Sequence, residues 1–189
     1  ITELPVDKNG LLDLSLFEES LAPDTAVVSL MWANNETGVI FPVEKAAELA
    51  RERGIPFHTD AVQTTGKIPI DMRKTAIDML SFSGHKLHAP KGIGVLYVRK
   101  GTRFSPFLIG GHQEKGRRGG TENTPSIIGL GKACELASGH LDTENKTVRR
   151  LRDRLETTLL TRIPNARVNG NIDQRLPNTT NISFEFVEG

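Results

Sequence analysis

The stretch VVSLMWANNETGVIFPVEKAAELARERGIPFHTDAVQ, residues 27–63, decides the fold of this 189-residue chain. It begins with a short apolar run of β-forming residues, 27–31, which is typical of a buried strand. A helix is predicted next, with Pro42 in its first turn and apolar residues at the spacing i, i+3, i+4, i+7. Gly54 ends that helix, and residues 55–59 form the next strand. This strand–helix–strand unit predicts parallel strands joined by a right-handed crossover.

Further strands and helices are predicted on both sides of this unit. The additional strands are expected at residues 2–6, 78–82, 92–99, 166–170 and 179–186, and the additional helices at residues 13–21, 124–139 and 143–163. The strand at 92–99 follows its predecessor too closely for a parallel return, which needs roughly a dozen connecting residues. It is therefore expected to be antiparallel. The fold class that follows is α/β, with a mixed, mostly parallel sheet and helices on both faces, in three layers.

The chain is expected to contain parts of two domains. Residues 1–142 are assigned to a large α/β domain that lacks its N-terminal part, and residues 143–189 to the start of a small α+β domain. The chain begins with Ile without a Met and stops just after a strand-like run, NISFEFVEG. We therefore expect an internal piece of a longer protein, whose missing segments would cover exposed sheet edges.

The composition excludes several classes of protein. Lys and Arg number 24 and Asp and Glu number 23, which gives a net charge of +1 and no support for general binding to nucleic acid or to membrane surfaces. A single cysteine excludes an internal disulfide framework and a multi-cysteine zinc site, and it fits a reducing, cytoplasmic compartment. No apolar run approaches the roughly 18 residues of a membrane helix.

Polar side chains follow three of the predicted strands. They are Asn34 and Asn35 after the first strand, Asp60 and Gln63 after the second, and Ser83, His85 and Lys86 after the third. In an open α/β sheet, ligands bind beyond the carboxyl ends of the strands. A metal would need more His, Cys or carboxylate ligands, and a nicotinamide cofactor would need a GxGxxG turn. Pyridoxal phosphate (PLP) needs a lysine for its aldehyde, an acid for its ring nitrogen and neutral donors for its oxygens, which is the set present here.

Four motifs in order resemble those of the NifS-like cysteine desulfurases, PLP-dependent members of the class-V aminotransferases. The motifs are NNETG at 34–38, HTDAVQ at 58–63, SGHK followed by PKGIG at 83–94, and GGHQE followed by GTEN at 110–123. Each motif alone is a weak signal, but four motifs in this order are specific, and the resemblance spans essentially the whole chain. The resemblance implies the large domain of the PLP-dependent aminotransferase-like fold.

The resemblance also implies a role for each site residue. Lys86 would hold PLP as a Schiff base and then shuttle protons, and Asp60 would pair with the ring nitrogen. The other cofactor contacts would come from Asn35 and Gln63 at the phenolic oxygen, from Ser83, Gly84 and His85 at the phosphate, and from Thr121 at a phosphate in the neighbouring subunit of a homodimer.

In this family L-cysteine is converted to L-alanine, and the sulfur passes as a persulfide to iron–sulfur cluster assembly or another acceptor protein. The family's nucleophilic cysteine and its substrate-carboxylate arginine lie past the strand at which this chain stops. The chain is therefore expected to hold the cofactor half of the site and to be inactive alone. Cys134 lies on the apolar side of a predicted helix and is expected to be a small buried hydrophobe, not the nucleophile.

Other interpretations remain open at this stage. A selenocysteine lyase shares these motifs, and a non-catalytic partner-binding homologue is possible, although Lys86 and Asp60 argue against it. A nucleotide-binding module is disfavoured, because neither GxxxxGK[ST] nor GxGxxG occurs before a helix. The histidines at 58, 88, 112 and 140 lack a metal-binding spacing and are expected to be structural or exposed. The arginine-rich segment 149–154 is expected on the solvent side of its helix.

Overall fold

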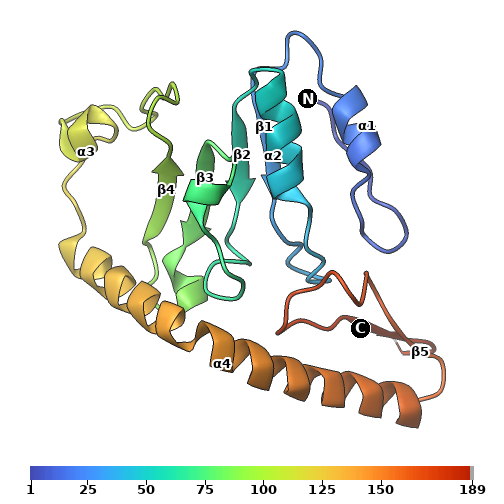
Figure 1. Cartoon of the computed structure of the whole chain (residues 1–189). Coiled ribbons are helices and arrows are strands. Elements are labelled where there is room, and N and C mark those ends of the chain that lie inside the picture. The colour runs from blue at the N-terminus through green and yellow to red at the C-terminus, as the bar shows by residue number, and fades with distance from the viewer. Residues whose placement is uncertain (188–189) are drawn as a thin grey trace.

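A four-stranded mixed sheet lies at the centre of the computed structural model, which describes residues 1–187 apart from the side chain of Glu144 (Figure 1). The strands lie side by side in chain order: β1 (Val28–Met31), β2 (Phe57–Asp60), β3 (Met79–Ser83) and β4 (Gly94–Val98). The first three are parallel, and β4 is antiparallel to β3. The predicted parallel unit, the antiparallel return and the mixed sheet are all confirmed.

Helix α2 (Val43–Glu52) covers β1 and β2, and helix α1 (Leu14–Glu19) packs against α2. The predicted apolar face of α2 is fully buried, and it consists of Val43, Ala46, Ala47 and Ala50. Phe17 of α1 and Phe57 of β2 complete the core, and each such buried side chain contributes roughly 1.5–3 kcal/mol. On the opposite face of the sheet, Ser29, Met31 and Asp60 are exposed.

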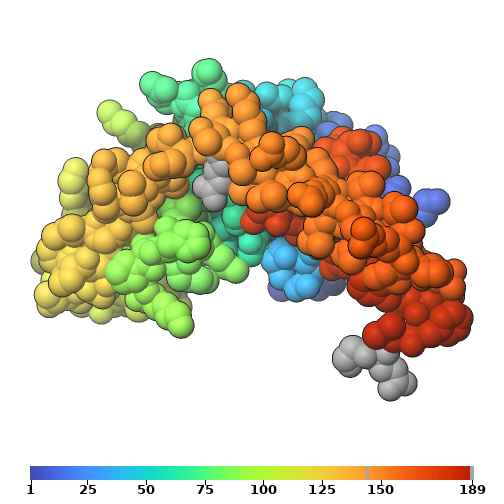
Figure 2. All heavy atoms as spheres, turned by 90° about the horizontal axis from the view of Figure 1, so that it is seen from below, coloured from blue at the N-terminus to red at the C-terminus, as the bar shows by residue number. Residues whose placement is uncertain are grey.

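Helix α4 (Thr124–Arg162) is one continuous helix of 39 residues, so the prediction of two helices, 124–139 and 143–163, is wrong. The expected break at Gly139 does not form, because a glycine costs a helix only about 1 kcal/mol relative to alanine. The cap of α4 is Asn123, whose side chain accepts a hydrogen bond from the Ser126 amide at 3.3 Å. Figure 2 shows that α4 forms much of the underside, with the C-terminal segment beside its second half.

The C-terminal segment forms a separate antiparallel pair, β5 (Ala166–Val168) and β6 (Ile182–Phe184). The remaining elements are single turns: η1 (Met72–Lys74), η2 (Gly84–Leu87) and α3 (Gln113–Gly116). The predicted strand at 2–6 is wrong, because only an isolated bridge joins Val6 to Leu12. Among the described helices, none has the length and apolar character needed to cross a membrane.

Candidate active site

The carboxyl ends of β1, β2 and β3 meet at one edge of the sheet, because these strands are parallel. Asp60, the last residue of β2, lies opposite Met31 on one side and Ser81 on the other. The backbone continues this pairing past the strand ends: the Trp32 amide donates to Asp60 O, and the Ala61 amide donates to Ser81 O, each at 2.8 Å. Asp60 therefore stands between the segments that carry Asn35 and Lys86, as the sequence pattern predicts.

A turn directly after β2 fixes the Asp60 carboxylate. Its Oδ1 accepts a hydrogen bond from the Val62 amide at 2.8 Å. The hydroxyls of Thr64 and Thr65 both donate to Ala61 O, at 3.2 and 2.9 Å, and hold the same turn closed. The carboxylate is exposed and accepts no other hydrogen bond from the described residues. One of its oxygens is therefore available to a ligand at this edge of the sheet.

The segment after β3 brings Ser83 and His85 together. Ser83 Oγ lies 2.6 Å from His85 Nδ1. Gly84 between them is buried, and a Cβ at this position would lie 2.7 Å from Ile93 Cγ2. The backbone of η2 therefore lies too close to the residues before β4 for a larger side chain to replace Gly84.

The amine of Lys86 is free within the described part of the chain. The side chain is exposed and forms no hydrogen bond or ion pair there. Lys86 also lines a cavity of about 470 Å³ between η2, the turn at residues 65–67 and helix α4. Asp60 and Asn35 do not line this cavity.

The loop after β1 is organised by Asn34 and not by Asn35. Asn34 Oδ1 accepts hydrogen bonds from the amides of Glu36 and Thr37, each at 2.9 Å. The Asn34 amide donates to Val39 O at 2.9 Å and closes the loop. Asn35 is exposed, and among the described residues its Nδ2 donates to the Glu36 carboxylate, at 2.8 Å. Of the two asparagines, Asn35 is the one whose amide can be redirected to a ligand.

The two other predicted site residues lie in different places. Gln63 is half-buried in the turn after Asp60, and its backbone oxygen accepts a hydrogen bond from Lys67 Nζ at 3.1 Å. Thr121 is exposed in the segment between α3 and α4, which lies beyond β4, at the edge of the sheet opposite β1 (Figure 1). The chain itself thus brings Gln63 to the strand ends and leaves Thr121 away from the β1 end of the site.

His58, two residues before Asp60 on β2, has the structural role predicted for it, but its hydrogen-bond partners could not be predicted. His58 Nδ1 lies 2.8 Å from Ser29 Oγ, and His58 Nε2 lies 3.1 Å from Ser81 Oγ, so the contacts cross β1, β2 and β3. Burial lowers the pKa of His58, and the nearby Asp60 charge opposes this shift only in part. Burial of this kind favours the neutral form of the imidazole. The pattern depends on strand register, which local sequence does not reveal.

The single cysteine is unsuited to nucleophilic chemistry. Cys134 is half-buried on α4, and burial raises the pKa of its thiol. Since the thiolate is the reactive form, this environment favours the inert thiol. The prediction of a small hydrophobic role for Cys134 agrees with these surroundings.

The comparisons with known proteins agree with this geometry. The family model for aminotransferase class V matches residues 1–189. The chain belongs to the class-V aminotransferase family. Over its whole length this class-V aminotransferase chain is 60% identical to a cysteine desulfurase of Nostoc sp. and 60% identical to the cysteine desulfurase NifS of Azotobacter vinelandii, covering 47% of each.

Solved structures give the same result for the fold. A NifS-like protein superposes with a TM-score of 0.92 at 40% identity, covering 97% of this class-V aminotransferase chain and 50% of the solved chain. DndA from Streptomyces lividans superposes with a TM-score of 0.89 at 38% identity, covering 98% and 53%. The aminotransferase-like fold is therefore confirmed. The chain spans about half the length of the curated relatives it matches.

Proposed function

We propose that the protein containing this chain is a PLP-dependent cysteine desulfurase, which takes sulfur from L-cysteine and leaves L-alanine and an enzyme persulfide. One observation carries the proposal: the free amine of Lys86 follows β3, and the available carboxylate of Asp60 ends the adjacent strand β2. The names of the most similar relatives support the substrate, since several are cysteine desulfurases.

The donor set at the sheet edge fits PLP. Lys86 offers an amine without a competing partner in the described chain, and Asp60 offers an oxygen that accepts no other hydrogen bond there. Ser83 and His85 form a hydrogen-bonded pair beside them, and both side chains can donate hydrogen bonds to an anionic phosphate. When bound, PLP supplies an electron sink for charge that develops at the substrate Cα.

The residues of this chain would act on the cofactor and on the substrate in distinct ways. The Lys86 amine would anchor the aldehyde carbon and, once released, move a proton at the substrate Cα. The Asp60 carboxylate would keep a proton on the ring nitrogen. The neighbouring His58 lies between two serines, and burial lowers its pKa, which disfavours a competing positive charge at that edge. Asn35 and Gln63 would donate to the phenolic oxygen.

The sulfur-accepting thiol is proposed to lie outside this chain. Cys134 is the only cysteine of residues 1–189, and it sits in α4 with a raised thiol pKa. The chain alone would therefore bind cofactor without transferring sulfur. We propose an iron–sulfur scaffold or another acceptor protein as the recipient of that sulfur, and a cytoplasmic location stays a prediction.

A homodimer would complete the cofactor site through Thr121. The segment before this residue exposes Phe107 and Ile109, which keep 93% and 91% of their surface accessible. Adjacent exposed apolar side chains of this size are typical of protein interfaces. A second subunit that covers them would bring its own strand ends close to the Thr121 loop.

The test uses the full-length protein that contains this chain. Added PLP is expected to give the visible absorbance band of a lysine-bound cofactor, and Lys86→Ala is expected to abolish it. Lys91→Ala, a nearby exposed lysine, serves as the matched control and should retain the band. Release of alanine and sulfide from cysteine is then compared with selenide release from selenocysteine. An unchanged band in Lys86→Ala would falsify the cofactor assignment, and a preference for selenocysteine would overturn the substrate assignment.

A further inference from the structure

The loop between β5 and β6, residues 169–181, closes over the loop that carries Asn35; we call residues 169–181 the clasp. The Ile40 amide donates to Gln174 O, and the Leu176 amide donates to Gly38 O, each at 2.9 Å. An isolated antiparallel bridge pairs Val39 with a clasp residue in the same place. The clasp and the loop after β1 therefore share a short ladder, although they are far apart in sequence.

Side-chain contacts extend the ladder toward Asn35. Asn181 Nδ2 donates to Glu36 O at 3.2 Å, next to Asn35 in the chain. A Cβ on Gly38 would lie 2.6 Å from Thr179 Cβ, and a Cβ on Gly170 would lie 2.9 Å from Thr37 Cβ. The clasp thus approaches the loop at two glycines, where no larger residue fits.

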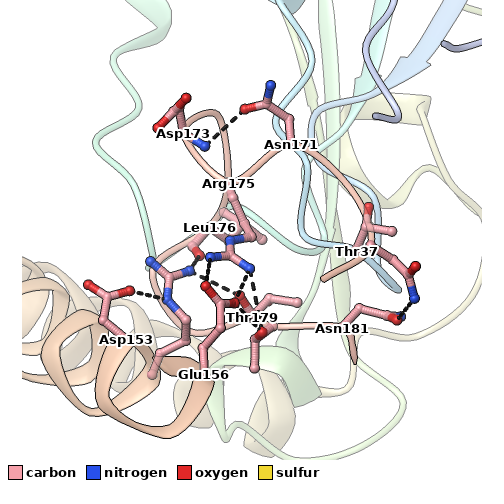
Figure 3. A network of polar contacts seen from close by, with 12 residues as sticks. Thr37, Asp153, Glu156, Asn171, Asp173, Arg175, Leu176, Thr179 and Asn181 are labelled. Carbon is pink, nitrogen blue, oxygen red and sulfur yellow. Dashed lines mark hydrogen bonds and ion pairs between the residues drawn. The ribbon is translucent and has the colours of Figure 1, made fainter. Parts of the chain in front are cut away.

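Two buried arginines fasten the clasp to α4 (Figure 3). Arg152 Nη1 donates to Leu176 O and Thr179 O, both at 3.0 Å. Arg175 donates to both oxygens of Glu156, at 2.6 and 3.0 Å. Arg152 is 8% exposed and Arg175 is 4% exposed, so the expectation that the arginines of 149–154 all face solvent is wrong for Arg152. It is buried because the clasp covers its side of α4.

The Arg175–Glu156 ion pair holds the clasp in one position on α4 but adds little to the free energy of unfolding. The hydroxyl of Thr180 also donates to Glu156, so the carboxylate is held from two sides. Arg175 Nε, however, is buried without a hydrogen-bond partner in the described chain. A buried ion pair that is incompletely satisfied adds little net stability, because desolvation offsets the attraction. Breaking it is nonetheless costly, since the remaining charge is left uncompensated.

We infer that Arg175 and Glu156 are positioning residues for Asn35, acting through the clasp. Within the described part of the chain, the side-chain hydrogen bond of Asn35 goes to the adjacent Glu36. Local bonds of Asn34 and Thr37 and the pairing of Phe41 with Trp32 close its loop, and the clasp adds hydrogen bonds from a distant part of the chain at Gly38, Ile40 and Glu36. Holding the loop in one conformation removes an entropic cost from ligand binding. This inference rests on the proposed function, in which Asn35 donates to the phenolic oxygen of PLP.

The experiment compares Arg175→Met with Asn35→Ala in the full-length protein. Both are expected to weaken PLP binding by about tenfold, the value of one hydrogen bond to a charged oxygen. Both should also raise the pH at which the absorbance band of lysine-bound PLP is half changed. A phenolic oxygen that has lost its hydrogen-bond donor carries more negative charge, so it holds the proton on the lysine nitrogen more strongly. In the double variant, Arg175→Met should add nothing further to the midpoint. Arg149→Met, an exposed arginine of the same helix, is the matched control.

Amide hydrogen exchange tests whether Arg175 acts on Asn35 through the clasp. The amides of Ile40 and Leu176 should exchange faster in Arg175→Met, while those of β2 and β3 stay protected. If Arg175→Met does not fold, Thr180→Val removes one Glu156 contact and is expected to produce smaller shifts in the same directions. Unchanged exchange, or additive midpoint shifts in the double variant, would overturn the inference. A band that does not depend on Lys86 would instead overturn the proposed function.

Discussion

Asp60 at the end of β2 lies directly opposite Ser81 of β3, two residues before the strand delivers Ser83 to the same edge of the sheet. The carboxylate and the lysine segment are therefore fixed to adjacent strands of one hydrogen-bonded sheet. Their spacing depends on backbone pairing and not on mobile loops. Substitution of Asp60 or Lys86 should consequently reduce catalytic activity more than it reduces the free energy of unfolding.

Asp60→Asn should retain PLP but lose turnover. The amide matches the shape of the carboxylate but carries no charge to keep a proton on the ring nitrogen. Alanine release is expected to fall by about 10²–10⁴-fold, the range of a lost acid–base contribution. The measurement is steady-state turnover of the full-length protein, with PLP content determined in parallel. Near-normal turnover in a PLP-loaded Asp60→Asn variant would contradict the role of this carboxylate.

Gly84→Ala should destabilise the segment that carries Lys86. The added methyl would meet Ile93 Cγ2 at 2.7 Å and Ile93 O at 3.1 Å. Overpacking of this kind costs about 1–3 kcal/mol in the free energy of unfolding. Gly131→Ala in α4 is the control, because its methyl meets nothing within 4 Å and should stabilise the helix by about 1 kcal/mol. If Gly84→Ala and Gly131→Ala had the same denaturation midpoint, the close packing of Gly84 against Ile93 would be contradicted.

His58 makes the stability of the sheet depend on pH. Its pKa in the folded chain lies below the ordinary value of 6.5, chiefly because of burial. Between these two values the unfolded chain binds more protons, so stability rises with pH. The contribution is complete above pH 6.5 and decreases as the pH falls toward the folded pKa. In His58→Gln the free energy of unfolding should depend less on pH in this range, measured by denaturant unfolding from pH 5 to pH 8. If the variant and the parent show the same pH dependence, His58 is not its source.

Glu156 should make the clasp sensitive to acid. The hydrogen bond from Arg175 lowers the pKa of this carboxyl below its ordinary value of 4.5. The stabilisation is therefore complete above pH 4.5 and is lost as the pH falls through the lower folded pKa. Amide exchange at Leu176, corrected for its intrinsic pH dependence, should accelerate in that range. In Glu156→Gln the acid-dependent step should disappear, and its persistence would assign it to another group.

Phe107→Asp and Ile109→Asp should dissociate the proposed homodimer. Each charge would stand at the centre of an apolar surface that a second subunit is expected to bury. Sedimentation velocity should show a shift from dimer to monomer, together with weaker PLP binding because Thr121 of the other subunit is removed. Leu151→Asp is the control, since Leu151 is 55% exposed on α4, away from this segment. A dimer that survives both variants would refute this interface.

The sequence by itself determined the β1–α2–β2 unit, the antiparallel β4 and the order of the polar strand ends. These features follow from local patterns, because apolar periodicity, helix-ending glycines and connection length act within one element or one crossover. The predicted positions of Asp60 and of the Ser83–Lys86 segment at one sheet edge follow from the same parallel pairing. For this reason the convergence of these strand ends at one sheet edge could be predicted from the sequence.

Tertiary structure decided the parts that depend on partners distant in the chain. Arg152 was expected to face solvent because an arginine-rich helical face usually does, and only the returning clasp buries it. The contact between Asn181 and Glu36 joins residues 145 positions apart, and the His58 contacts depend on the register of three strands. Local sequence sets which conformations a segment prefers. Which side chains meet is decided by the folded packing of segments that the sequence keeps far apart.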